Sequence, residues 1–331
     1  MADKMETILK VENLKKFFPI KKGIIRTTAG KVHAVDDVSF SAVKGETLGI
    51  VGETGCGKTT LGRTILHLYK PSEGAVYFED KLISQMTQRE LLPYRRNFQM
   101  IFQDPYESLN SRHTVGYILE EPFIIHKLEN KQQRTEKVKK LLDKVGLQKN
   151  SLDKFPHEFS GGQRQRIGIA RAIALNPKLI ICDEPVSALD VSIQSQILNL
   201  LMDLQSDLGL TYIFISHDLT VVRHVSDRVA VMYLGRIVEI AGADEIYETP
   251  LHPYTKALIS AIPRPSAGKE IKRIILQGNV PSPVNPPTGC YFHPRCPIAQ
   301  DICRQKYPDL INYSLNESEQ MAACHFAGYE K

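Results

Sequence analysis

Short apolar runs alternate with helical patterns along most of this chain. Residues 47–51, 179–182 and 211–216 are mostly apolar, which is typical of strands buried on both faces of a parallel sheet. Residues 9–14 and 33–40 instead alternate apolar and polar side chains, as strands with one covered face do. The chain therefore predicts buried parallel strands together with half-exposed ones.

A hairpin and a helical segment lie between the first two buried runs. Residues 71–83 predict the hairpin, with its turn at Pro71–Gly74. Between residues 112 and 178 the apolar period becomes that of a helix, and Gly146 is a good C-terminal stop for one helix. Strands that alternate with helices in this way predict an α/β fold.

Length and charge narrow the class of protein. A chain of 331 residues can bury a large core and predicts two unequal domains. The net charge of +5 gives no reason to expect nucleic acid as a partner. No apolar run approaches the roughly 18 residues that span a bilayer. Residues 1–16 lack the apolar core of a signal peptide, so we expect a cytosolic protein that only a partner would hold at a membrane.

The strongest chemical signal is a glycine-rich stretch that follows the run at residues 47–51 and precedes a predicted helix at residues 60–68. Glycines there let backbone N–H groups converge on phosphate oxygens, and the helix adds its positive end. Lysine can reach the outer phosphates, and a threonine hydroxyl can bind Mg²⁺. Glycine-rich turns occur elsewhere, but this full pattern predicts a purine nucleoside triphosphate. The residues are Gly52, Glu53, Thr54, Gly55, Cys56, Gly57, Lys58, Thr59 and Thr60.

Polar side chains follow three other predicted strands. Asp183 ends the run at residues 179–182 and is placed to meet the magnesium shell, while Glu184 can polarise an attacking water as general base. Gln103 follows a strand and can bind magnesium or position water. His217 follows another strand and can sense the γ-phosphate. Each has an ordinary structural alternative, but strand ends of one parallel sheet share an edge, where ligands bind.

A second helix start carries an anion-binding pattern. Ser160 precedes Gly161, Gly162 and Gln163 before a helical run that Asn176–Pro177 ends, which predicts a capped helix N-terminus. Near the N-terminus, Phe17 or Phe18 can stack on a base or pack in the core. The residues alone leave that choice open.

The six cysteines are unevenly placed. Four of them lie in the C-terminal part of the chain: Cys290, Cys296, Cys303 and Cys324. Residues 250–331 also contain 11 of the 19 prolines. A loop-rich segment needs a cross-link, and a cytosolic compartment disfavours disulfides. Four thiolates can hold tetrahedral zinc or an iron–sulfur cluster, and free structural cysteines are the alternative.

In their order, these residues resemble those of an ATP-binding cassette. The resemblance implies a phosphate-loop ATPase core with a RecA-like parallel sheet, an antiparallel β subdomain and a helical subdomain at about residues 104–178. It implies that Gln103 and Asp183 act with Mg²⁺, that Glu184 is catalytic and that His217 is the switch. It also adds Asp190 of the D-loop and favours Phe18 as the base-stacking aromatic, where the family usually has Tyr or Trp.

The C-terminal residues narrow the resemblance. Leu251–Leu258, Gly278–Pro283 and the cysteine-rich end resemble the extension of oligopeptide and dipeptide permease ATP-binding subunits, of the F type. The resemblance implies a nucleotide-binding domain at 1–245 and an extension at 246–331. It favours a [4Fe–4S] cluster over zinc at the four cysteines.

The resemblance also implies an assembly. It has a second, related ATP-binding subunit as heterodimer partner, two transmembrane permease subunits, and an extracytoplasmic peptide-binding protein that acts indirectly. The chain would then lie on the cytoplasmic face of the membrane, with Ser160 and Gly162 contacting ATP bound by the partner. A nickel or glutathione importer, or a non-transport cassette ATPase, is the alternative. The interval of about 100 residues between the two motifs has no sustained heptads, against a chromosome-maintenance protein.

Overall fold

The computed structural model describes most of the chain, which divides into two compact units. The first, here the helical unit, contains residues 43–46 and 85–215 with the first described residues. The second, here the phosphate-loop unit, contains residues 9–42, 47–84 and everything from residue 216 onward. The described residues are 6–22, 27–262, 273–314 and 319–328.

Parallel strands form the centre of the helical unit. They lie in the order β8 (Thr211–Ile215), β7 (Leu179–Asp183) and β6 (Phe98–Ile101). Every residue of β7 and β8 is buried, which accounts for their unbroken apolar runs. The expectation of buried parallel strands is confirmed here.

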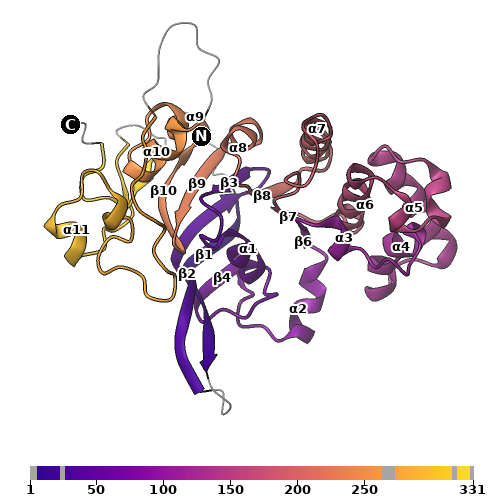
Figure 1. Ribbon diagram of the computed structural model, residues 1–331. Coiled ribbons are helices and arrows are strands. Elements are labelled where there is room, and N and C mark those ends of the chain that lie inside the picture. Colours follow the sequence, from indigo (N-terminus) through magenta and orange to yellow (C-terminus); the bar gives the residue numbers. More distant parts are fainter. Residues whose placement is uncertain (1–5, 23–26, 263–272, 315–318, 329–331) are drawn as a thin grey trace, which may run out of the picture. The chain divides into compact units, whose positions relative to one another are not determined.

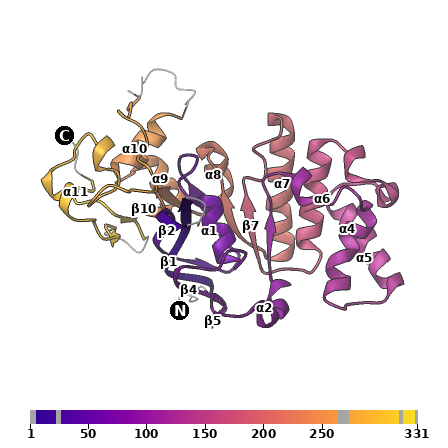
Figure 2. The same ribbon diagram turned by 60° about the horizontal axis from the view of Figure 1, so that its bottom comes forward.

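The helices of this unit gather around α6, and both views show α4, α5 and α6 together (Figures 1 and 2). In α5 the residues at helical spacing, Val138, Leu141 and Leu142, are the buried ones. The sequence pattern missed α2, which begins at a Thr87–Glu90 capping box. The helices are α2 (Gln88–Arg95), α3 (Pro105–Ser108), α4 (Val115–Ile125), α5 (Lys131–Lys144), α6 (Gly161–Ile173) and α7 (Val191–Leu208), with 3₁₀ turns at Lys149–Asp153 and Pro156–Glu158.

The phosphate-loop unit contains strands of two sheets. One has the order β2-β1-β4-β5, and the strands of the other follow the order β11-β12-β10-β9-β3. In this unit β3 pairs with β9 in parallel, whereas β1–β4, β4–β5 and β9–β10 are antiparallel pairs. The strands are β1 (Thr7–Lys22), β2 (Thr27–Val43), β3 (Thr47–Val51), β4 (Glu73–Phe78), β5 (Lys81–Leu82), β9 (Arg228–Tyr233), β10 (Arg236–Gly242), β11 (Ile311–Asn312) and β12 (Met321–Ala322).

The predicted position of the hairpin turn is wrong. The turn lies at Glu79–Asp80, between β4 and β5, and both residues are left-handed, with φ of 45° and 61°. Gly74, expected in the turn, lies inside β4. A Cβ on Gly74 would come 2.3 Å from the Asn13 carbonyl oxygen, so this glycine allows β4 to approach β1.

The loop-rich C-terminal segment folds within the phosphate-loop unit. Strand β12 pairs with β10, with Glu239 opposite Ala322, and Figure 1 shows the yellow C-terminal loops beside α10 and β10. A small loop-rich extension was the expectation, and it is confirmed. The helices of this unit are α1 (Lys58–Ile65), α8 (Leu219–Val225), α9 (Ala243–Glu248), α10 (Pro253–Ser260) and α11 (Asp301–Gln305), with a 3₁₀ turn at His293–Arg295.

A buried carboxylate holds the start of α10. Glu239 in β10 is fully buried and accepts hydrogen bonds from the backbone N–H groups of Leu251 (2.7 Å) and His252 (2.9 Å). Burial raises the pKa of Glu239, and the hydrogen bonds from these backbone groups counter that rise. Burial also lowers the pKa of His252 to about 3, so its neutral Nδ1 accepts from the Tyr254 N–H at 3.0 Å.

We expect Glu239→Ala to destabilise the protein, because it leaves two buried N–H groups without their acceptor. The free energy of unfolding should fall by about 2–4 kcal/mol in urea titrations. Glu248→Ala removes an exposed carboxylate of α9 and should change it by no more than about 0.5 kcal/mol. Equal effects of the two substitutions would contradict this role for Glu239.

Candidate functional site

The glycine-rich loop joins β3 to α1 in backbone conformations that suit glycine. Gly52, Gly55 and Gly57 have φ of +154°, +82° and +106°. A Cβ on Gly52 would lie 2.1 Å from the Met232 carbonyl oxygen, and one on Gly57 would lie 1.9 Å from that of Ala34. The loop therefore packs by its backbone against the neighbouring strands.

Lys58 and the first turn of α1 supply positive charge at this loop. Lys58 is buried, and its ammonium donates to the carbonyl oxygens of Gly52 at 2.7 Å and Glu53 at 3.3 Å. The N-cap residue Gly57 has no side chain to cap the first turn of α1, and the N-terminal end of a helix favours an anion. Thr59 and Thr60 lie in this first turn. Cys56 is buried, and burial raises the pKa of its thiol.

The C-terminal extension holds this loop at Glu53, which the sequence reasoning did not foresee. The Glu53 N–H donates to Tyr254 Oη at 2.9 Å. Arg295 donates to both carboxylate oxygens of Glu53, at 2.9 and 3.1 Å. Burial alone would lower the pKa of Arg295, but its hydrogen bonds to Glu53 and Tyr233 raise it. Partners 242 positions apart left no local sequence signal.

Two further expected site residues belong to the same unit. His217 is exposed and follows Ser216, whose N–H donates to the Ile50 carbonyl of β3 at 3.2 Å. The His217 segment thus lies beside the strand that leads into the glycine-rich loop. Phe18 in β1 is half-buried, and its ring meets that of Tyr69 edge-on, with centroids 5.4 Å apart.

The helical unit brings Gln103 and Glu184 together. Gln103 Nε2 donates to Glu184 Oε2 at 3.0 Å. Glu184 follows β7 with φ of 46°, and its N–H donates to the Ile215 carbonyl of β8 at 2.9 Å. A left-handed non-glycine residue costs about 1–3 kcal/mol, and such residues cluster at functional sites. Asp183, one residue earlier, is buried at the end of β7.

The start of α6 has the predicted cap. Ser160 Oγ accepts the Gln163 N–H at 3.3 Å, and Gln163 Oε1 accepts the Ser160 N–H at 3.1 Å. Ser160, Gly161 and Gln163 are exposed, so this helix end faces solvent. A Cβ on Gly162 would lie 2.5 Å from Ile193 of α7. Asp190 is the N-cap residue of α7 and is also exposed.

The four C-terminal cysteines line one cavity in the phosphate-loop unit. Cys290, Cys296, Cys303 and Cys324 surround it with His252 and Phe292 among other residues. Burial raises the pKa of the Cys290 and Cys296 thiols to about 12 and about 11. Within the described ranges, no three His, Cys, Asp or Glu side chains form a group that could hold one metal ion.

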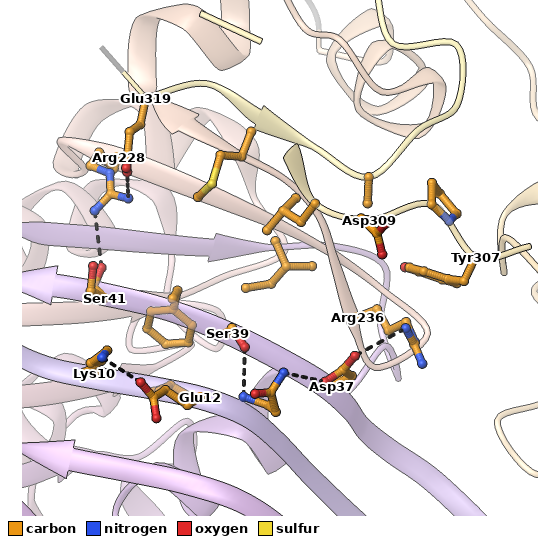
Figure 3. A pocket seen from close by; sticks show the side chains of 18 residues that line it. Lys10, Glu12, Asp37, Ser39, Ser41, Arg228, Arg236, Tyr307, Asp309 and Glu319 are labelled. Atoms are coloured by element: carbon orange, nitrogen blue, oxygen red, sulfur yellow. Dashed lines mark hydrogen bonds and ion pairs between the residues drawn. The ribbon is translucent and has the colours of Figure 1, made fainter. Parts of the chain in front are cut away.

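A charged pocket marks a second attachment of the extension (Figure 3). Arg228 donates to the Ser41 carbonyl at 3.2 Å and lies 3.6 Å from the Glu319 carboxylate. Arg236 lies 3.9 Å from Asp37 of β2. The strands and the C-terminal segment are therefore joined by ion pairs around this pocket.

Solved structures share this arrangement. The structure of cbiO1 from Clostridium perfringens, part of the ABC transporter complex cbiONQ, matches with a TM-score of 0.63 at 30% identity, over 74% of this chain and 92% of that one. A dimeric post-hydrolysis state of the ATP-binding cassette MJ0796 bound to ADP and Pi matches with the same TM-score at 28% identity, over 71% and 99%. With the phosphate loop and the strand-end carboxylates, these matches define the class: an ATP-binding cassette ATPase.

Sequence comparisons place the chain more finely. The family profile described as "ABC transporter" matches residues 35–187, and that described as "Oligopeptide/dipeptide transporter, C-terminal region" matches residues 238–303. The oligopeptide transport ATP-binding protein AppF of Bacillus subtilis (strain 168) is 54% identical over 98% of each chain. The dipeptide transport ATP-binding protein DppF of Haemophilus influenzae is 49% identical over 93% of this chain and 94% of its own. The chain belongs to the oligopeptide/dipeptide branch of the ABC transporter ATP-binding proteins.

Among the helices described, none combines the length and the apolar character that crossing a bilayer requires.

The contacts of the loop glycines predict that alanine at position 57 weakens MgATP binding more than alanine at position 55. Gly57→Ala drives a Cβ into the Ala34 carbonyl and should displace the loop. We expect the displaced loop to lose at least roughly 1.4 kcal/mol of binding free energy, which corresponds to a tenfold change in affinity. The Kd for MgATP, measured by titration calorimetry, should therefore rise at least about tenfold. Gly55→Ala meets nothing within 4 Å and should cost only about 1–2 kcal/mol of backbone strain. A larger loss of affinity at position 55 would contradict the packing argument.

Proposed function

We propose that this protein is the ATP-hydrolysing subunit of an importer for oligopeptides or dipeptides. The observation that carries the proposal is the similarity to an oligopeptide transport ATP-binding protein over 98% of the chain, extension included. The match of residues 238–303 to the oligopeptide/dipeptide C-terminal region supports the same substrate class. We place the boundary between nucleotide-binding domain and extension near residue 245.

The proposed chemistry divides among the residues at the strand ends. The backbone of residues 52–59 and the Lys58 ammonium bind the phosphates, and Phe18 stacks on the base. Thr59, Gln103 and Asp183 would hold Mg²⁺, for which hydroxyl, amide and carboxylate oxygens are suitable ligands. Magnesium supplies charge neutralisation when bound.

Glu184 is the proposed general base, and His217 contacts the γ-phosphate. The hydrogen bond from Gln103 at 3.0 Å supports this role, because it orients the Glu184 carboxylate.

A second cassette would complete each site. The exposed start of α6, with Ser160 and its glycines, supports contact with a nucleotide bound by another chain. We propose that the partner is a related subunit and that ATP binding closes the pair. Two permease subunits would transmit closure through the segment after Gln103, and a peptide-binding protein would deliver the cargo outside. The chain would act at the cytoplasmic face of the membrane.

Glu184→Gln should retain MgATP binding and lose turnover. A glutamine keeps the shape but cannot accept the proton, so the ATPase rate should fall by about 10²-fold or more. Phosphate release measures the rate, and calorimetry measures binding. Glu136→Gln, on an exposed carboxylate of α5, is the matched control. Near-normal turnover in Glu184→Gln would remove the general-base assignment.

The same pair of variants tests the substrate class in cells that lack the native gene. Wild type and Glu136→Gln should restore uptake of a labelled tripeptide, and Glu184→Gln should not. Uptake of nickel or glutathione in place of peptide would contradict the proposed substrate.

We further propose that Cys290, Cys296, Cys303 and Cys324 hold a [4Fe–4S] cluster. Support comes from the donor chemistry, four thiols around one cavity. Tetrahedral zinc bound by the same four thiols is the alternative. The cluster would cross-link the loop-rich extension.

Protein purified without oxygen should contain about four iron and four sulfide per chain and absorb near 400 nm. Cys303→Ser should lose the iron, whereas Cys182→Ala, on a buried cysteine of β7, should keep it. Zinc at one equivalent with no iron would overturn the cluster in favour of a zinc site.

A further inference from the structure

The phosphate loop is held from outside the cassette motifs, at Glu53. Its carboxylate accepts both terminal nitrogens of Arg295, at 2.9 and 3.1 Å, and its N–H donates to Tyr254 Oη. The Arg295 side chain is 8% exposed and that of Glu53 is 28% exposed, so solvent screens this pair only in part. A two-point contact of this kind fixes direction as well as distance.

The charge on Glu53 matters because of where it lies. It is the second residue of a loop whose ligand carries several negative charges. An unpaired carboxylate there would repel phosphate, and the Arg295 guanidinium neutralises it. Arg295 also lies near Tyr233 of β9, with Nη1 3.5 Å from Oη.

The position of Arg295 is set in turn by the cysteine segment, which is defined here as residues 290–296. Cys290 and Cys296 are its ends, and both line the cysteine cavity. Successive backbone bonds fold it into a tight turn: His293 to Cys290, Arg295 to Phe292 and Cys296 to His293, at 3.0, 3.0 and 3.3 Å. The arginine that holds the phosphate loop therefore sits between two cavity cysteines.

Aromatic packing provides a second connection between the cysteine segment and the phosphate loop. Phe292, within the segment, is buried against Tyr233 and Tyr254, with ring centroids 5.3 and 5.4 Å away. Tyr254 is the residue that accepts from the Glu53 N–H. A shift of the segment would thus move both contacts on Glu53.

We propose that Arg295 is a positioning residue of the phosphate loop. We also propose that the cysteine segment makes the affinity for MgATP depend on whether the cysteine cavity holds iron or zinc. The proposal rests on the proposed function in assuming that this loop binds ATP. Arg295 acts through Glu53. The extension thereby acquires a role in nucleotide binding besides its place in the fold.

The first test separates charge pairing from folding. Calorimetry measures the Kd for MgATP in the full chain, with Glu184→Gln as background to prevent turnover. Arg295→Gln should weaken binding at least about tenfold, since it leaves the Glu53 carboxylate unpaired beside the phosphates. Arg295→Lys should recover part of the loss, because it restores the charge without the two-point contact.

The double variant Glu53→Gln/Arg295→Gln should recover most of the affinity lost in Arg295→Gln, because it removes the unpaired charge. Arg304→Gln, on an exposed arginine of the extension, is the control and should bind as the background does. Binding by Arg295→Gln within twofold of the background would overturn the proposal, as would a double variant no better than Arg295→Gln. Should Arg295→Gln not fold, Arg295→Lys is compared with the background in its place, and MgATP binding within twofold of the background would overturn the proposal.

The second test addresses coupling to the cavity. Cys296→Ser should lose iron or zinc, measured directly, and weaken MgATP binding in the same direction as Arg295→Gln. Both substitutions act through the contact between Arg295 and Glu53. The double variant Arg295→Gln/Cys296→Ser should therefore bind MgATP no more than about twofold more weakly than the weaker-binding single variant. Loss of metal with unchanged affinity, or fully additive losses, would overturn the coupling. If the background protein fails to bind MgATP at all, the proposed function fails instead.

Discussion

The phosphate loop can adopt its shape only because it approaches the surrounding strands with bare backbone. Met232 of β9 and Ala34 of β2 present carbonyl oxygens where side chains of Gly52 and Gly57 would lie. The Gly235 N–H donates to the Cys56 carbonyl, and the Asp36 N–H donates to the Gly235 carbonyl, both at 2.8 Å. The loop is therefore shaped by strands on both sides, and changes in them reach the phosphates.

Much of the fold could be predicted because its signals are local. The burial of β7 appears as an apolar run, and the cap of α6 appears as Ser160 three residues before Gln163. The glycines of the phosphate loop mark their own conformation. The turn at Glu79–Asp80 was not predicted, because Pro71–Gly74 carries the stronger turn signal and only Asp80 of the two turn residues is of a type that tolerates a left-handed backbone.

The candidate site was predictable in its residue types but not in its contacts. Parallel strands end at one edge, so Gln103 and Glu184 were expected near each other, yet the hydrogen bond between them depends on the left-handed backbone at Glu184. Glu53 and Arg295 pair although they are 242 positions apart in the sequence. Only tertiary packing brings such distant residues together.

The capping hydrogen bond at the start of α6 uses the Ser160 hydroxyl oxygen as acceptor and does not involve its proton. A serine oxygen can accept and donate at once, and in Ser160 it is the accepting role that closes the helix end, through the Gln163 N–H. In the proposed pair of cassettes, a phosphate oxygen bound by the other chain would accept a hydrogen bond from this hydroxyl without disturbing the bond to Gln163. If the proposed partner binds there, its association and dissociation would require no unwinding of the helix, so the conformational cost of each cycle at this contact would be small.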